Sequence, residues 1–274
     1  MKNFILRVIT GAAYVAAIFA ALFTTMPVFF AVFGIIMLFA LNEFYKNLKV
    51  KDITVDLVLS NALAVGIYLL PIVKFYSIEF PLLSIVIVLA LALFAIELFR
   101  NDEQPFQRIA FSLCGIVYVC VPFTLLAFFQ GENVVAFGFF SFVSSYMILQ
   151  LFAFTWINDT FAYLTGMLLG KHPLCPKISP KKTIEGFAGG CFFTIVCAAV
   201  IAYVTEFQLW PTVGLAVLIV IASTLGDMVE SRFKRWVGVK DSGKMLPGHG
   251  GFLDRFDSVI FSIPIFFAYL QIFG

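Results

Sequence analysis

Long apolar runs alternate with short polar segments along the chain. A helix that crosses a bilayer needs about 20 predominantly apolar residues, and nine runs come close to this length. They cover residues 8–25, 27–42, 56–73, 81–98, 109–129, 144–169, 187–205, 211–228 and 256–273. Each is expected to be helical because lipid offers the backbone no hydrogen-bond partners. The pattern predicts an all-α integral membrane protein, a polytopic helical bundle of about nine transmembrane helices.

One stretch fits this pattern poorly. Residues 135–170 are too many for one span and too few for two, so a broken or partly interfacial helix is expected there. Internal repeats and soluble linkers are not evident in the sequence, which favours a single domain over residues 1–274. Polar and ionisable residues enter the apolar runs mainly from Asn158 onward. They point to a functional half at about residues 156–257.

Lysine and arginine accumulate in alternate loops. The basic positions are Lys46, Lys49 and Lys51; Arg100 and Arg108; Lys171, Lys177, Lys181 and Lys182; and Arg232, Lys234, Arg235, Lys240, Lys244 and Arg255. The connections 130–134 and 206–211 carry one Glu each and no Lys or Arg. Because positively charged loops stay cytoplasmic, the basic loops and the N-terminus are expected on the cytoplasmic side.

Composition narrows the class further. The chain is 62% hydrophobic and 12% charged, whereas soluble domains are about half apolar and a quarter charged. A water-soluble enzyme, a disulfide-rich secreted scaffold and a disordered chain are therefore excluded. The net charge of +2 gives no reason to expect nucleic acid. The five cysteines form no CxxC pair and are expected to be free and buried.

Two polar clusters precede the strongest feature. Asn158 and Asp159 fall inside an apolar run, where an ionisable side chain usually faces a polar cavity or a partner. The alternative is that Asp159 lies at a helix end in water. The second cluster is the segment 179–186, with Ser179, Lys181 and Lys182 just before a run. Such lysines either contact a ligand or mark the cytoplasmic edge of the membrane.

The strongest feature lies around the last polar loop. Asp227 ends one run, and Asp254 and Asp257 begin the next. Three residues apart, Asp254 and Asp257 share one face of a helix. Carboxylate oxygens without nearby Cys or paired His favour a hard cation such as Mg²⁺. The predicted metal ligands are therefore Asp227, Asp254 and Asp257.

The loop between these acids suits phosphate. The glycines of Gly248-His249-Gly250-Gly251 let backbone N–H groups approach an anion closely, and six Lys or Arg residues surround them. Acids for a metal with amides and bases for phosphate fit a nucleotide and its Mg²⁺ at the membrane surface. The alternative is a plain basic loop with a few salt bridges.

The segment 231–257 reads SRFKRWVGVKDSGKMLPGHGGFLDRFD. At every specified position it resembles the signature of the phosphatidate cytidylyltransferases, also called CDP-diacylglycerol synthases. The segment 179–186 and the Asn158-Asp159 pair also resemble features of that family. The N-terminal half resembles it only in hydropathy and length.

The resemblance implies Mg²⁺-dependent transfer of CMP from CTP to phosphatidic acid, giving CDP-diacylglycerol and pyrophosphate for phospholipid biosynthesis. A second bound cation is left open. The catalytic residues it implies are Asp227, Asp254, Lys240, Asp241, His249 and Arg255. The substrate-binding residues it implies are Asn158, Asp159, Ser179, Lys181, Lys182, Ser231, Lys234, Arg235, Lys244, Gly250 and Gly251.

The expected partners are CTP, phosphatidic acid and the lipid bilayer, without nucleic acid; a homodimer is left open. Short polar tails favour the plasma (bacterial inner) membrane, with several passes and an active site that faces the cytoplasm. One alternative is a lipid or polyprenol kinase that uses CTP and releases CDP. Another is a transporter with Asp159 and Asp227 as coupling-ion sites. Transporters often have duplicated halves, whereas the polar residues here concentrate in one half.

Overall fold

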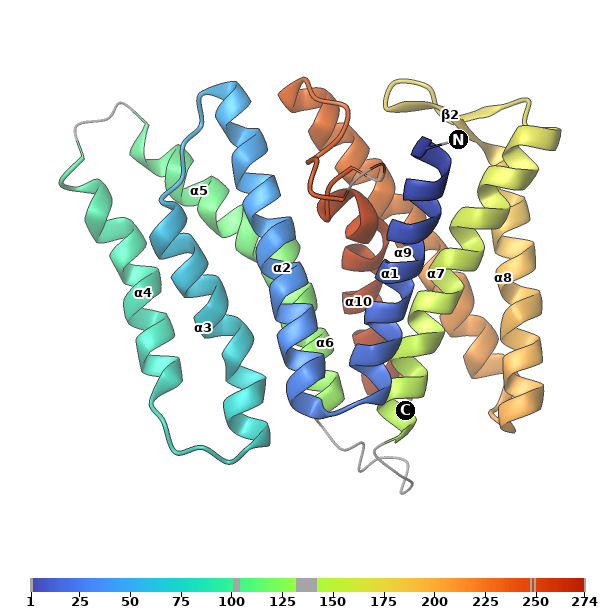
Figure 1. Cartoon of the computed structure of the whole chain (residues 1–274), viewed down its shortest axis with the longest axis horizontal. Helices are drawn as coiled ribbons and strands as arrows, with labels where there is room; N and C mark the ends of the chain where they lie inside the picture. The colour runs from blue at the N-terminus through green and yellow to red at the C-terminus, as the bar shows by residue number, and fades with distance from the viewer. Residues whose placement is uncertain (1, 101–103, 132–141, 247, 249, 274) are drawn as a thin grey trace. The chain divides into compact units, whose positions relative to one another are not determined.

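The computed structural model describes residues 2–100, 104–131, 142–246, 248 and 250–273 (Figure 1). Most of them are helical. The helices are α1 (Lys2–Phe23), α2 (Met26–Leu48), the 3-10 helix η1 (Lys49–Lys51), α3 (Leu57–Phe75), α4 (Leu82–Glu97), α5 (Pro105–Gly115), the π-helix η2 (Ile116–Cys120), α6 (Val121–Gly131), α7 (Phe142–Leu169), α8 (Ile184–Thr205), α9 (Leu209–Val237) and α10 (Leu253–Phe273). All nine predicted apolar runs lie largely in helices, and the run at 109–129 is built from α5, η2 and α6.

Several helices are long and apolar enough to cross a membrane. Within the described residues there are six such segments: Met26–Lys51, Leu57–Phe75, Pro105–Gly131, Ile184–Thr205, Leu209–Val237 and Leu253–Phe273. The protein is therefore a helical, multi-pass membrane protein, and the count of nine spans stays a prediction. The expected break in 135–170 is wrong over residues 142–169, because α7 runs through them as one helix. Residues 132–141 lie outside the described part.

The helices group into two compact units that interleave along the chain. The first unit comprises Met1–Val135, Phe139–Ser145 and Trp236–Phe256. The second comprises Ala136–Gly138, Tyr146–Arg235 and Asp257–Gly274. The predicted functional half, residues 156–257, is therefore divided between the two units.

In the first unit, α2 contacts α1, α3, α5 and α6. Buried tyrosine hydroxyls hold this packing. Tyr45 Oη donates to the Ser112 carbonyl at 2.7 Å and Tyr68 Oη to the Phe30 carbonyl at 2.9 Å. Each buried donor thus has a backbone acceptor, which avoids the cost of an unpaired hydroxyl.

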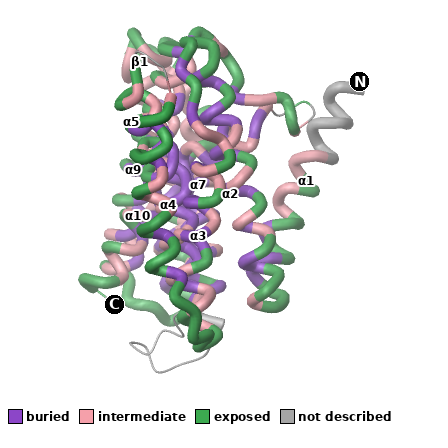
Figure 2. Tube along the Cα trace, turned by 90° about the vertical axis from the view of Figure 1, so that its left-hand side faces the viewer, coloured by how far each residue is buried: buried purple, intermediate pink, exposed green. Residues whose placement is uncertain are grey.

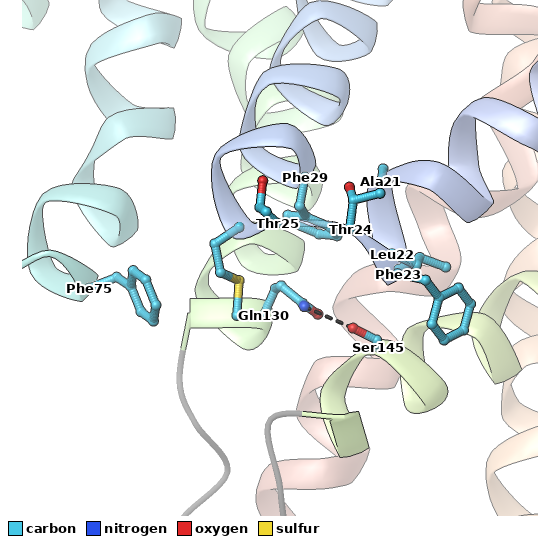
Figure 3. Close-up of a pocket in the computed structure, with 10 residues that line it drawn as sticks. Ala21, Leu22, Phe23, Thr24, Thr25, Phe29, Phe75, Gln130 and Ser145 are labelled. Atoms are coloured by element: carbon cyan, nitrogen blue, oxygen red, sulfur yellow. Dashed lines mark hydrogen bonds between the residues drawn. The ribbon is translucent and has the colours of Figure 1, made fainter.

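The first unit also contains a cavity of about 350 Å³ at the start of α2, drawn in Figure 3. Phe29 and Phe75 line it, and Gln130 Nε2 donates to Ser145 Oγ at 3.0 Å in its wall. Glu43, which accepts a hydrogen bond from Ser242 in the loop between α9 and α10, lies 17 residues after Met26 along α2, roughly 25 Å at the helical rise per residue. The cavity is therefore remote from the polar loop that follows α9.

In the second unit, glycines let α7 and α8 pack closely. A Cβ atom built on Gly186 would lie 2.7 Å from the Ala162 carbonyl oxygen and 3.2 Å from Gly166 Cα. The rings of Phe161 and Phe193 stack with centroids 3.9 Å apart. Small residues at such a crossing are the usual way for membrane helices to approach one another.

A two-stranded antiparallel hairpin precedes α8 and departs from the all-α prediction. It consists of β1 (Pro173–Cys175) and β2 (Ser179–Thr183). Thr183 caps α8, since its side chain accepts from Gly186 N at 3.1 Å. Glu185 accepts from the backbone N–H groups of Lys171 and His172 at 3.1 and 3.2 Å. These contacts fix the hairpin against the start of α8.

Many large apolar side chains of the helices are exposed, and Figure 2 draws the exposed positions in green. Examples are Leu91 on α4 and Phe192 on α8, which are 62% and 61% exposed. Such surfaces would be costly in water and are normal against lipid acyl chains. The five cysteines are free, as predicted, but only Cys120 is buried and Cys114 is exposed. A small apolar thiol is equally acceptable on a lipid-facing surface.

Candidate active site

The loop between α9 and α10, in the first unit, contains the longest sequence motif. Gly248 and Gly250 have φ angles of 78° and 86°, a region that side chains other than glycine's rarely adopt. Leu246 N donates to the Gly250 carbonyl at 3.0 Å. The glycines thus turn the backbone tightly. His249 lies outside the described residues, and its predicted role stays a prediction.

Asp254, in the first turn of α10, fixes this loop. Its Oδ2 accepts from Ser242 N at 2.9 Å and from Gly251 N at 2.8 Å. A carboxylate is also favourable at a helix N-terminus. Asp254 is predicted as a metal ligand and catalytic residue, and the structure adds a backbone-holding function. The Gly251 N–H, predicted to bind phosphate, donates to Asp254 instead.

Two residues of α2 reach the same loop, and sequence reasoning missed both. Glu43 is 4% exposed, and its Oε2 accepts from Leu253 N at 2.9 Å and from Ser242 Oγ at 3.3 Å. Asn47, one turn later, donates from Nδ2 to the Ser242 carbonyl at 2.8 Å. A signal was present: a glutamate at the end of an apolar run, with an asparagine four residues later on the same face.

Basic side chains of the loop and of the first turn of α10 remain available to a ligand. Lys240, Lys244 and Arg255 are exposed, and none of them makes an ion pair with another described residue. Asp241 beside Lys240 is exposed as well. Exposed and unpaired cations suit an anionic ligand such as a phosphate group.

In the second unit, β2 and α9 bring together two predicted site residues. Lys182 of β2 forms an ion pair with Asp227 of α9. Ser231, one turn further along α9, donates from Oγ to Asp227 Oδ1 at 3.3 Å. Lys181 is exposed and Ser179 is half-buried in the same hairpin. Of the two neighbouring lysines, Lys182 therefore contacts a carboxylate, whereas Lys181 is exposed.

Carboxylates from three helices form a common electrostatic cluster in this unit. Asp159 of α7, Asp227 of α9 and Asp257 of α10 are close enough to repel one another. The ammonium groups of Lys182 and Lys234 offset part of this repulsion. We call Asp159, Asp227 and Asp257 the carboxylate cluster.

Buried polar contacts support the cluster. Asn158, 2% exposed, donates from Nδ2 to Ser223 Oγ at 3.1 Å and so links α7 to α9. Lys234 pairs with the fully buried Glu230 at 2.5 Å, while Arg235 is exposed. The predicted substrate residues Asn158 and Lys234 are therefore both held by protein partners.

The chemistry of the carboxylate cluster fits a hard cation. Its donors are all oxygens that bear negative charge, which is the ligand type that Mg²⁺ prefers. Across the described ranges, no three His, Cys, Asp or Glu side chains are already gathered as a metal site. Of the predicted ligands, Asp227 and Asp257 belong to the second unit and Asp254 to the first. The magnesium site stays a prediction.

Comparison with known proteins defines the class, a membrane-embedded nucleotidyltransferase. The sequence matches the cytidylyltransferase family over residues 5–273. The chain therefore belongs to the cytidylyltransferase family, and the resemblance seen in the segment 231–257 is confirmed.

Relatives match over most of their length. A protein of Staphylococcus aureus (strain COL) is 35% identical over 234 residues, 85% of each chain. One of Staphylococcus haemolyticus (strain JCSC1435) is 36% identical over 233 residues, 84% of this chain and 85% of the relative. One of Staphylococcus saprophyticus is 35% identical over 254 residues, 89% of this chain and 93% of the relative. Each of the three is named phosphatidate cytidylyltransferase.

Proposed function

We propose that this protein transfers CMP from CTP to phosphatidic acid in a Mg²⁺-dependent reaction that yields CDP-diacylglycerol and pyrophosphate. The observation that carries the proposal is the match to relatives named phosphatidate cytidylyltransferase over 84–89% of the chain. The apolar helices are suited to the lipid bilayer, which is where a diacylglycerol-containing substrate is found. We place the enzyme in the bacterial plasma membrane, with its basic loops, its active site and its N-terminus on the cytoplasmic side.

The reaction makes one phosphorus–oxygen bond and breaks another. A phosphate oxygen of phosphatidic acid attacks the α-phosphorus of CTP. The bond from that phosphorus to the oxygen bridging the β-phosphate breaks, and its electron pair leaves with pyrophosphate. Because a phosphomonoester is largely ionised near neutral pH, no general base is needed. Catalysis is then mainly positioning and stabilisation of charge.

The protein must bring two polyanions together. Lys240, Lys244 and Arg255 are exposed and unpaired among the described residues, so they can bind phosphate oxygens through charge-assisted hydrogen bonds. Lys181 offers a further ammonium from the hairpin of the second unit. Each cation lowers the repulsion between CTP and the lipid phosphate.

The carboxylate cluster would bind a cation, whereas the basic side chains bind phosphate. Asp227 and Asp257 would hold Mg²⁺, and Asn158 and Asp159 would line the same polar region. Asp254, in the first unit, stays a predicted metal ligand. A bound Mg²⁺ would neutralise charge on the phosphates and on the leaving pyrophosphate. Lys182, paired with Asp227, keeps this carboxylate oriented.

The test is direct. Detergent-purified protein is incubated with CTP, Mg²⁺ and phosphatidic acid in mixed micelles, and pyrophosphate and lipid-linked CMP are measured together. Equal amounts of both, lost with EDTA and absent without phosphatidic acid, are expected. Release of CDP with a phosphorylated lipid would identify a kinase instead. Folded protein that consumes no CTP would contradict the proposal.

A further inference from the structure

Ser242 lies at the centre of a hydrogen-bonded network in the first unit. It is 3% exposed, and each of its polar groups has a partner. Its N–H donates to Asp254, its carbonyl accepts from Asn47, and its Oγ donates to Glu43. The same Oγ accepts from Asp254 N at 3.2 Å. Ser242 therefore connects α2 to the first turn of α10.

The carboxylate of Glu43 is buried in an apolar helix, which is energetically unfavourable. A carboxylate in an apolar, membrane-spanning helix is strongly unfavourable unless it is well partnered. Oε2 has two donors, whereas Oε1 has no hydrogen-bond partner within the described part of the chain. Gly243 and Gly251 both leave room for this carboxylate, because a Cβ atom on either would collide with it. Such a costly and closely fitted carboxylate indicates a role beyond packing.

We propose that Glu43 and Asn47 are positioning residues for the reaction. They fix the Ser242 peptide. The Ser242 N–H in turn holds the Asp254 carboxylate, and Ser242 Oγ accepts from the Asp254 backbone N–H. The catalytic consequence rests on the proposed cytidylyltransferase function, whereas the mechanical link does not. Asp254 acts at the site, while Glu43 and Asn47 act through Ser242 without touching substrate.

The test compares variants of the full chain in detergent. Glu43→Gln keeps the size of the side chain and removes its charge, and Asn47→Leu removes the donor to Ser242. The matched control is Glu97→Gln, because Glu97 is a buried glutamate of the same unit whose partner is Arg100. Hydrogen exchange is followed in the peptide covering residues 240–246, and kcat is measured with saturating substrates.

Both positioning variants are expected to raise amide exchange in this peptide at least about tenfold, as a local opening would. They should lower kcat roughly 10- to 100-fold, because small displacements of catalytic groups are costly. Glu97→Gln should change neither. Glu43→Gln combined with Ser242→Ala should lose less activity than the product of the two single losses. A smaller folded fraction would instead multiply the two losses.

The outcomes separate the two claims. Wild-type exchange and wild-type kcat in both Glu43→Gln and Asn47→Leu would overturn the positioning role. If the wild-type protein does not turn over CTP, the proposed function fails and the exchange data alone decide the link. If Glu43→Gln fails to fold, Asn47→Leu decides it, since that variant leaves the carboxylate in place.

Discussion

Lys182 of β2 forms an ion pair with Asp227 of α9, so a predicted phosphate-binding residue contacts a predicted metal ligand. Both side chains are partly exposed, at 28% and 29%. Asp159 and Asp257 repel Asp227, and the Lys182 ammonium reduces the negative charge of this cluster. Lys182 can therefore pair with either of two anions, the Asp227 carboxylate or a substrate phosphate.

Lys182→Met is expected to lower kcat/KM for CTP by about 10- to 100-fold, since a hydrogen bond to a charged group contributes roughly 1.5–3 kcal/mol. Steady-state rates of pyrophosphate release measure this. The matched control is Lys177→Met, an exposed lysine in the turn of the same hairpin, which should stay near wild type. Equal rates for the two variants would remove Lys182 from the site.

Asp254→Asn should reduce turnover by at least about 100-fold, because a neutral amide neither holds a cation nor keeps the loop in place. If the amide oxygen takes the place of Oδ2, the amide nitrogen takes the place of Oδ1, 3.1 Å from Ser242 N, so that two donors face each other. We expect a loss of stability of about 1–3 kcal/mol from this mismatch. Turnover and the thermal midpoint are measured on the same preparation.

The control for this variant is Asp52→Asn. Asp52 is exposed and has a φ of 58°, which asparagine tolerates well. It should behave as wild type in both measurements. Near-normal turnover of Asp254→Asn would show that the carboxylate charge is not needed in the reaction.

The helices could be predicted because lipid imposes a simple rule of length and apolarity. Each of the nine runs is long and apolar enough to be recognised one at a time, without knowledge of its neighbours. The hairpin at 173–183 could not be predicted, since its prolines and lysines show no alternation of apolar and polar residues. The length of the stretch 135–170 suggested a break, although α7 continues through residues 142–169 as one helix.

The candidate site was predictable where it is local and was missed where it is not. Asp254 and the glycines stand together in one motif, so their spacing alone identifies them. Glu43 lies 199 residues before Ser242, and nothing in a single sequence pairs the two. Its charge instead marked the end of the apolar run at residue 42. Long-range contacts of this kind require the fold.

Gly251→Ala should destabilise the protein by about 1–3 kcal/mol, the usual cost of overpacking. A Cβ atom at this position would collide with the Glu43 carboxylate and Ser242 Oγ. Gly238→Ala is the comparison, since its φ is 85° but no atom lies within 4 Å of the added Cβ. It should cost only about 1 kcal/mol, from backbone strain. The free energy of unfolding is measured by chemical denaturation in detergent. Equal losses of this free energy in both variants would contradict the close fit around Glu43.

The orientation in the membrane follows from the basic loops and can be tested by cysteine labelling. In a background without the five native cysteines, Lys177→Cys and Gln208→Cys place single thiols at exposed positions, one before the start of α8 and one after its end. Because positively charged loops stay cytoplasmic, a membrane-impermeant maleimide applied to intact cells should label Gln208→Cys and not Lys177→Cys. Permeabilised cells should label both, which controls for reactivity of the thiols. Labelling of Lys177→Cys alone in intact cells would invert the topology and place the hairpin lysines on the side without CTP.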